Sequence, residues 1–419
     1  METVQWINFG IAVTFFLCYT YQIIYIIVGC VKSPPKILAE KNHRYAVLIA
    51  ARNEEKVIEA LIQSINQQEY PSELLDIYVI ADNCDDHTAE VARDCGARVF
   101  ERRSKTHVGK GYALESLLKH IWQSGATYEG YFVFDADNLL SPNYIREMNH
   151  HFDRGERVIT GYRNSKNYSD NWISAGYSLW FLRESRFLNQ PRSMLNTSCA
   201  VSGTGFLVHH DILARNGGWK HFLLTEDIEF TADLILQGER ITYCPTAVLF
   251  DEQPTMFTQS WRQRLRWAKG YLQVFRHYGI RLFERLMRKK HFACLDMILT
   301  IMPAIVLTIV GVTVNLSAGI YALVMADTLR VLVTSMLQML LNTYGFLLLI
   351  GLVTAIFEWR QIHASTARKV WSIFTFPVFM MTYIPISLCA LFANVTWQPI
   401  EHTKAIKIHE MEKERTMVA

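Results

Sequence analysis

The stretch Tyr131-Phe132-Val133-Phe134-Asp135-Ala136-Asp137-Asn138 decides the fold class of this chain. Four successive apolar residues predict a buried strand, and the polar residues after them predict a loop at its carboxyl end. Two carboxylates at positions i and i+2 of an extended chain point the same way and repel each other unless a cation lies near them. Asp135 and Asp137 are therefore candidate ligands for Mg²⁺ or Mn²⁺, although an Asp-x-Asp pair is also common by chance.

The same strand-to-loop pattern occurs upstream of this stretch. Short apolar runs alternate with helical periodicity, in the order 45–50, 54–65, 77–81, 98–100 and 111–122. Strands that alternate with helices predict an α/β fold with a mostly parallel, helix-covered sheet, in which ligands collect at the carboxyl ends of the strands. The polar loops 51–55 and 82–86 follow two of these strands, although helix capping would also explain their Asn and Asp residues.

Three more polar motifs lie in the same half of the chain. Gly109-Lys110-Gly111 opens a predicted helix, where backbone N–H groups and a lysine could meet phosphate, but it lacks the spacing of a phosphate-binding loop. The stretch Ser202-Gly203-Thr204-Gly205-Phe206 predicts either a close backbone approach or a plain turn. In Thr225-Glu226-Asp227, acids start a predicted helix, and Thr225 could simply cap it.

Composition limits the classes of protein that remain. The chain has 419 residues, of which 50% are hydrophobic and 19% charged, so it is not a disordered chain. A net charge of +3 gives no whole-chain reason to expect a nucleic acid partner. The eight cysteines show no paired spacing typical of zinc or redox sites, so we expect them to be reduced.

Four apolar runs predict membrane spans. Residues 5–31 contain no charge and are long enough to cross the bilayer as a helix, and they are too long for the core of a cleaved signal peptide. Further runs cover residues 297–325, about 333–357 and about 370–395, the last broken by Pro385. The chain is thus predicted to be a multi-pass protein of the plasma membrane.

Basic residues beside these runs predict the orientation. They are Lys32, Lys36, Lys41 and Arg44 after the first run and Arg288, Lys289 and Lys290 before the second. By the positive-inside rule the domain between the runs is cytoplasmic. Basic residues beyond residue 400 favour a cytoplasmic tail as well, although three full crossings after the domain would leave that tail outside.

A basic, amphipathic stretch joins the domain to the later spans. It begins at Gln263-Arg264-Leu265-Arg266-Trp267, runs to Lys290 and contains Glu284 as its only acid. Apolar residues recur in it at helical spacing, which predicts an interfacial helix on anionic lipid. Membrane anchoring explains the charges, but it does not explain why a Gln and a Trp bracket two arginines.

Taken in chain order, four motifs resemble those of membrane-embedded family 2 glycosyltransferases. This group includes cellulose, chitin and hyaluronan synthases and bacterial poly-N-acetylglucosamine synthases. The motifs are Asp82, Asp135-Ala136-Asp137, Thr225-Glu226-Asp227 and Gln263-Arg264-Leu265-Arg266-Trp267. The resemblance covers nearly the whole chain, and it implies a GT-A-type, Rossmann-like cytoplasmic domain with transmembrane and interfacial helices.

The resemblance also implies a role for each site residue. Asp227 matches the general base, with Glu226 beside it, and Asp135 and Asp137 match the residues that hold Mg²⁺ or Mn²⁺. The nucleotide sugar would be bound by Ala51, Arg52, Glu54, Asp82, Lys110, Asp135, Gln263, Arg264 and Arg266. The acceptor would be contacted by Trp267 and by Ser202, Gly203, Thr204 and Gly205. Trp397 and His402 lie where related synthases carry a gating loop.

These expectations divide the chain into five segments. They are an anchor at 1–35, a glycosyltransferase domain at 36–260, the basic segment at 261–292, membrane helices at 293–396 and a tail or gating segment at 397–419.

The expected function is inverting transfer from UDP-glucose or UDP-N-acetylglucosamine. The expected product is a β-linked glycan that grows on a glycan acceptor and crosses the bilayer, with accessory export subunits as candidate partners. Transfer of one sugar to a lipid is the alternative, and a non-catalytic receptor or transporter subunit is a third.

Overall fold

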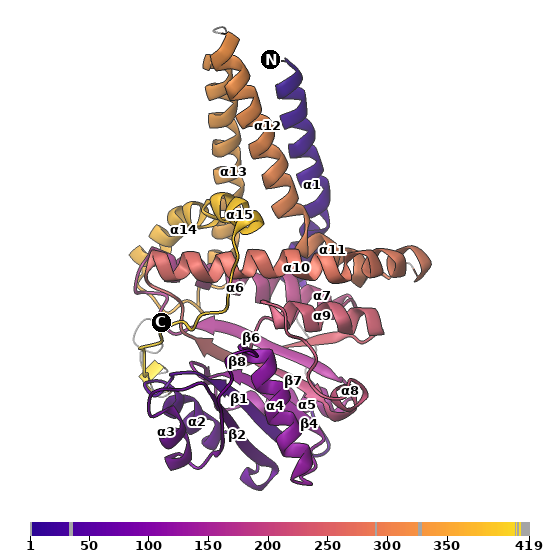
Figure 1. Ribbon diagram of the computed structural model, residues 1–419, viewed down its shortest axis with the longest axis vertical. Coiled ribbons are helices and arrows are strands. Elements are labelled where there is room, and N and C mark those ends of the chain that lie inside the picture. The colour runs from indigo at the N-terminus through magenta and orange to yellow at the C-terminus, as the bar shows by residue number, and fades with distance from the viewer. Residues whose placement is uncertain are drawn as a thin grey trace.

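The computed structural model describes residues 2–32, 37–289, 291–325, 329–406, 408, 410 and 411. The predicted flanking charges Lys36 and Lys290 and the end of the predicted tail beyond Met411 lie outside the described residues. Figure 1 shows a sheet domain at one end, a group of long helices rising from the other end, and the long helix α10 (Phe257–Lys289) lying between them.

The predicted strands pair side by side in the sheet. They form β1 (Tyr45–Ala51), β2 (Leu75–Asp82), β3 (Arg98–Arg102) and β4 (Gly130–Asp135). All are parallel, and β1 lies between β2 and β4. Their apolar runs are buried almost completely, because helices cover both faces of the sheet.

The second half of the domain makes the sheet mixed rather than mostly parallel. The remaining strands are β5 (Leu139–Leu140), β6 (Val158–Ser165), β7 (Phe206–His209) and β8 (Ile241–Asp251). The strand order is β3-β2-β1-β4-β7-β6-β8-β5. β7 runs antiparallel to both β4 and β6, and β5 runs antiparallel to β8, whereas β6 and β8 are parallel. The α/β, Rossmann-like fold class is thus confirmed, with an antiparallel insertion in its sheet.

The helices of the domain begin where polar motifs end the strands. They are α2 (Ile58–Asn66), α3 (Thr88–Asp94), α4 (Lys110–Gln123), α5 (Tyr144–Asp153), α6 (Trp172–Glu184), α7 (Gln190–Met194), α8 (His210–Arg215) and α9 (Glu226–Gln237), with a 3₁₀ turn at Ser72–Leu74 and a π-helical turn at Ser185–Asn189. The start of α4 at Lys110 confirms the predicted helix, and Gly109 before it has a φ of 135° that other residues rarely adopt. The main core lies between the sheet and these helices.

Three long helices rise away from the sheet domain (Figure 1). They are α1 (Glu2–Val31), α12 (Pro303–Met325) and α13 (Leu329–Phe357), and α12 packs against both of the others. By length and composition, Trp6–Val31, Met336–Phe357 and Thr366–Phe392 could each cross a membrane. The bent pair Phe292–Ile301 and Val306–Ala318 would be a fourth span. The first of these pieces is α11 (Phe292–Ile301), which packs against α10.

The run predicted at residues 370–395 folds as two short helices. These are α14 (Thr366–Met381) and α15 (Tyr383–Phe392), which meet at Thr382, and Pro385 lies in the first turn of α15, where proline is tolerated. Both lie beside α10 at the base of the rising helices (Figure 1). The segment after α15 returns to the sheet domain, where His402 lies 3.0 Å from the Glu54 carboxylate, and a cytoplasmic tail stays a prediction.

Candidate active site

A cavity of about 1400 Å³ joins the carboxyl ends of the strands to the long apolar helices. At one end it is lined by Ala51, Asp82 and Asp135, which end β1, β2 and β4. Its middle lies against α9 and α10, and its far end lies among α1, α12 and α13. The edge of the sheet that the sequence predicts as the ligand site therefore opens toward these helices.

The two aspartates after β4 lie in this cavity in different surroundings. Asp135 is partly exposed, and its Oδ1 accepts a hydrogen bond of 2.5 Å from Nζ of Lys110, which also donates to the carbonyl of Gly203 at 2.6 Å. Asp137 is buried, and its Oδ2 accepts from the backbone N–H of Glu252 at 2.9 Å. Burial opposes ionisation of Asp137, but nearby positive groups outweigh burial and lower its pKa.

The predicted nucleotide-sugar residues on the first two strands line the same end of the cavity. They are Ala51, Arg52, Glu54 and Asp82. Asp82 is buried and accepts a hydrogen bond of 2.5 Å from Arg102. Helix capping does not explain the first loop, because the residue before α2 is Val57, which makes no side-chain cap. In the second loop, Oδ1 of Asp86 accepts from the backbone N–H of Thr88 at the start of α3, at 3.1 Å.

The segment after α15 closes this end of the cavity. Trp397 lies 5.2 Å from the guanidinium of Arg52, in cation–π geometry. Nδ1 of His402 lies 3.0 Å from the Glu54 carboxylate, and its Nε2 lies 3.9 Å from Oδ2 of Asp137. Although burial lowers the pKa of His402, these two carboxylates outweigh it and raise the pKa to about 10. Trp397 and His402 are thus part of the site, and gating by them stays a prediction.

The acids at the start of α9 face the middle of the cavity. Burial raises the pKa of Glu226 to about 7, with the charge of Asp227 adding to the effect. Burial also raises the pKa of Asp227 above its usual range. Thr225 precedes them but makes no cap, and its buried hydroxyl has no partner among the described residues. A carboxylate held in this way is a stronger base than an exposed one.

The first half of the loop before β7 lines the cavity, and the second half packs against β4. Ser202 and Gly203 line the cavity, and a Cβ built on Gly203 would lie 3.7 Å from Oδ2 of Asp227. Thr204 and Gly205 do not line it. The hydroxyl of Thr204 accepts from the backbone N–H of Asp135 at 2.9 Å, and Gly205 donates its N–H to the carbonyl of Val133. These two residues hold the loop against β4, and Thr204 supports the cavity wall from behind through the backbone of Asp135.

Helix α10 supplies the next wall of the cavity through Gln263, Arg266 and Trp267. A Cβ on Gly270 would lie 2.5 Å from the side chain of Thr225, so glycine lets α10 approach the start of α9. This close approach places the basic segment beside Asp227, as the order of the motifs predicts.

Arg264 is predicted to bind the nucleotide sugar, but unlike Gln263, Arg266 and Trp267 it does not line the cavity. It is fully buried outside the cavity and donates from its Nη1 to the carbonyl of Phe379 at 3.0 Å and to Oγ1 of Thr382 at 2.5 Å. Its guanidinium lies 4.3 Å from the ring of Phe379. Residues two apart on a helix point to different faces, so Arg266 faces the cavity while Arg264 joins α10 to the end of α14.

Sequence reasoning missed a group of charged residues across the cavity from α9. Nε of Arg163 on β6 donates to Oδ2 of Asp251 at the end of β8, at 2.6 Å, and Nη1 of Arg163 donates to the carbonyl of Ser202 at 2.8 Å. Glu252 also lines the cavity, and its carboxylate accepts from the N–H of Thr403. The run Val-Leu-Phe-Asp-Glu at 248–252 has the same pattern as residues 131–137, an apolar strand that ends in acids. This pattern could have identified Asp251 and Glu252 as candidate site residues.

The donor set fits a divalent cation shared with a substrate. Within the described residues there is no group of three His, Cys, Asp or Glu side chains able to hold a metal alone. Asp135 and Asp137 provide two carboxylates in the cavity, and Mg²⁺ at phosphate sites is commonly held by one or two carboxylates together with substrate phosphates.

Comparisons with known proteins agree with this geometry. A family model described as "Glycosyltransferase like family 2" matches residues 43–270. The β-monoglucosyldiacylglycerol synthase of Trichormus variabilis is 28% identical over 268 residues, which cover 61% of this chain and 55% of that protein. The poly-β-1,6-N-acetyl-D-glucosamine synthase of Staphylococcus aureus strain COL is 26% identical over 264 residues, which cover 62% of this chain and 61% of that protein.

A probable glycosyltransferase, YdaM of Bacillus subtilis, is 25% identical over 270 residues, which cover 59% of each chain. The matches therefore span only about three fifths of the length of these relatives. Among solved structures, the mannosyltransferase PcManGT of Pyrobaculum calidifontis, in complex with GDP-Man and Mn²⁺, has a TM-score of 0.56. It is 17% identical, with coverage of 91% of this chain and 98% of that one, so it supports the GT-A fold alone. On the family match, which covers more than half of its residues, this chain belongs to the family 2 glycosyltransferases.

Proposed function

We propose that this protein is an inverting glycosyltransferase that uses UDP-glucose or UDP-N-acetylglucosamine at the cytoplasmic face of the plasma membrane. The single observation that carries the proposal is the convergence of Asp135, Asp137, Asp227 and Arg266 on one cavity. These side chains come from three separate regions of the sequence, and a structural role for each would not bring them together.

The donor end of the cavity supports a nucleotide diphosphate. Asp82 and Arg52 would contact the base and ribose, while Lys110, Gln263 and Arg266 would contact the diphosphate and the sugar. A divalent cation held by Asp135 and Asp137 would neutralise charge that develops on the departing diphosphate. Fixed cationic donors act most strongly in a site shielded from water, and Trp397 and His402 cover part of this end through their contacts with Arg52 and Glu54.

Asp227 supports the chemistry of transfer. An acceptor hydroxyl is a poor nucleophile at neutral pH, so a carboxylate that accepts its proton speeds attack. The oxygen of the acceptor forms a bond to the anomeric carbon as the bond to the diphosphate breaks, and UDP leaves. Direct displacement inverts the anomeric centre, so an α-linked donor gives a β-glycosidic product.

A growing glycan is the acceptor that we favour. The cavity continues past Trp267 to the membrane helices, where Gln338 and Asn342 of α13 line it and hydrogen-bond to each other at 2.9 Å. Polar side chains among apolar helices are costly unless they have a polar neighbour. The amides of Gln338 and Asn342 could therefore form hydrogen bonds with the hydroxyls of a sugar in the cavity. This supports extension and export of a β-linked polysaccharide, with accessory subunits as candidate partners.

A lipid acceptor is the second candidate, because the membrane part of the cavity is open at one side. Phe16 of α1 lines the cavity but remains 58% exposed. A lipid could reach the site through that side, and one curated relative is a diacylglycerol glycosyltransferase by name.

Product analysis tests the proposal. Purified protein in detergent is incubated with each UDP-sugar and Mg²⁺ or Mn²⁺, and UDP release and radiolabelled product are measured. We expect UDP release that chelation abolishes, with a ladder of products that β-specific hydrolases digest. A single chloroform-soluble product would favour the lipid acceptor, and the absence of UDP release from every donor would contradict the proposed function.

A further inference from the structure

Glu184 is one of the carboxyl groups in the cavity that the proposed chemistry does not use. Glu184 ends α6, lines the cavity and accepts a hydrogen bond on Oε1 from Oγ of Ser202 at 2.9 Å. Among the described residues it forms no ion pair within 4.0 Å, unlike Asp251 with Arg163 or Asp135 with Lys110. Its second oxygen accepts no hydrogen bond from the described residues, and the positive charges of Arg163 and Arg192 act on it only over a longer distance.

Aromatic side chains line the cavity beside Glu184. On α6, Trp180 and Phe181 precede it by four and three residues, so all of them share one face of the helix. On α10, Trp267 and Tyr271 also line the cavity, and the ring of Trp267 packs edge to face on that of Phe181, with 6.2 Å between the ring centroids, so the two helices form one aromatic wall. Aromatic faces beside a carboxyl group suit a saccharide, which presents apolar C–H faces and hydroxyl edges.

The backbone around Glu184 is irregular. The chain leaves α6 through the π-helical turn Ser185–Asn189, which directly follows Glu184. Such turns occur frequently at functional sites, where they re-aim a side chain. Next to Glu184, Arg183 donates to Gln22 of α1 at 2.6 Å, so the turn lies where the domain meets the first membrane helix.

We propose that Glu184 binds a hydroxyl group of the acceptor saccharide, in a subsite on the cavity wall that α6 and α10 form together, and thereby sets which acceptor oxygen faces Asp227. This inference rests on the proposed function and names the acceptor of the same site as a saccharide. Burial raises the pKa of Glu184, so its carboxyl can also donate a hydrogen bond to an acceptor oxygen. Glu184 is then a specificity-determining residue beside the base.

The test compares acceptor and donor kinetics in Glu184→Ala and Glu184→Gln. The probes are chitobiose with UDP-N-acetylglucosamine and cellobiose with UDP-glucose. We expect Glu184→Ala to raise the KM for the probe about tenfold, the scale of one lost hydrogen bond to a charged group, and to change the donor KM much less. Glu184→Gln, which keeps a hydrogen-bonding end, should recover part of the loss.

Glu358→Gln is the matched control. Glu358 is also a buried carboxyl with a raised pKa near the membrane helices, but it pairs with Tyr162 and lies outside the cavity. We expect it to lower the melting temperature and to leave the ratio of the two KM values unchanged. The proposal would be overturned if Glu184→Ala changed the KM for the saccharide probe and the KM for the donor equally. It would also be overturned if Glu358→Gln raised the KM for the probe and left the donor KM unchanged.

A binding measurement separates this inference from the proposed function. Trp180 and Trp267 line the subsite, so titration with chitobiose or cellobiose should quench tryptophan fluorescence of the wild type without any donor present. The quench should weaken in Glu184→Ala. If the wild type binds a probe but never releases UDP, the proposed function fails and the subsite stands. If the wild type binds neither probe, the saccharide subsite is wrong.

Discussion

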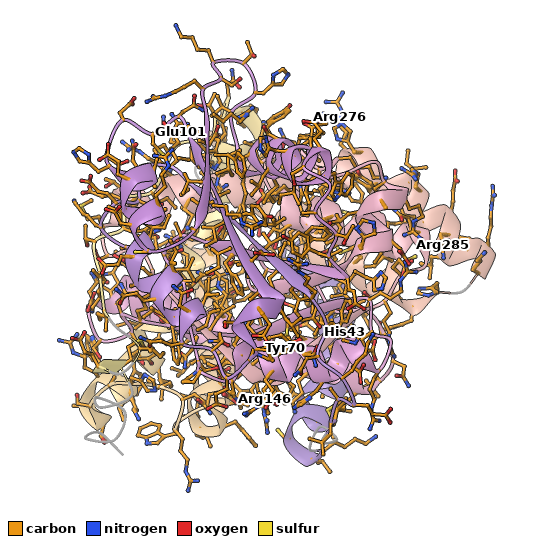
Figure 2. All side chains as sticks on the ribbon, turned by 90° about the horizontal axis from the view of Figure 1, so that it is seen from below. His43, Tyr70, Glu101, Arg146, Arg276 and Arg285 are labelled. Atoms are coloured by element: carbon orange, nitrogen blue, oxygen red, sulfur yellow. The ribbon has the colours of Figure 1, made fainter. Side chains whose placement is uncertain are left out.

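The two ends of the same sheet carry polar clusters of opposite character. At the amino ends of the strands, the rings of His43 and Tyr70, labelled in Figure 2, belong to a cluster in which each polar group has a partner. His43 contacts Glu129 at 2.7 Å and Asp153 at 2.8 Å through its two ring nitrogens. Oδ1 of Asn149 accepts from the hydroxyls of Tyr45 at 2.7 Å and Tyr70 at 3.0 Å.

The carboxyl ends of the strands are left incompletely paired. Buried polar atoms there have no partner among the described residues, namely Nε of Arg52, Nζ of Lys166, Oγ1 of Thr225 and Oε1 of Gln263. Several carboxyls there also have raised pKa values. A satisfied cluster stabilises a fold, whereas unsatisfied groups destabilise it and are retained where a ligand can complete them. The comparison therefore separates the stabilising end of the sheet from its reactive end.

Asp227→Asn should have the largest effect on activity. The amide keeps the shape of the side chain but cannot accept the proton of the acceptor, so we expect UDP release with acceptor to fall about 100-fold or more. The melting temperature should stay the same or rise, because a buried charge is removed. A variant that retains full turnover would show that another group is the base.

Asn149→Ala, at the amino ends of the strands, should lower the stability of the protein and leave its activity largely unchanged. It removes the acceptor of both tyrosine hydroxyls and a donor to the carbonyl of Lys41, so we expect unfolding to become easier by about 2 kcal/mol. Thermal denaturation measures the loss, and kcat is compared at a temperature where the variant is folded. A large fall in kcat without a change in stability would contradict the division of the two ends.

Glu226→Gln should have the smallest effect. The charge of Asp227 helps to raise the pKa of Glu226 to about 7, so Glu226 takes up a proton before Asp227 does as pH drops. Asp227 acts as a base only when it is ionised, and burial raises its pKa above the usual range. Because Glu226 is already neutral where Asp227 titrates, the substitution should leave the acid limb of the kcat/KM profile at the pH of the wild type. A limb that moves would show that Glu226 takes part in the proton transfer.

Much of the reactive end was predictable, because its signals are local. The motifs at Asp82, Asp135 and Asp227 each follow a strand or start a helix, and parallel strands bring such ends to one edge. Arg163 with Asp251 was missed because the pairing of β6 with β8 joins residues far apart in sequence. The sequence does not distinguish Arg264 from Arg266, because both are arginines of the same motif. Which of them faces the cavity depends on how α10 is oriented about its own axis in the folded protein.

The order of synthesis gives the closing segment a further meaning. Trp397 and His402 follow α13 in the chain, yet they complete the pocket formed by β1 and β2. A ribosome exposes them only after the helices that are long and apolar enough to cross a membrane have been made. The pocket is therefore among the last parts of the protein to be completed, and a chain that stops short of residue 397 carries β1 and β2 without these two side chains.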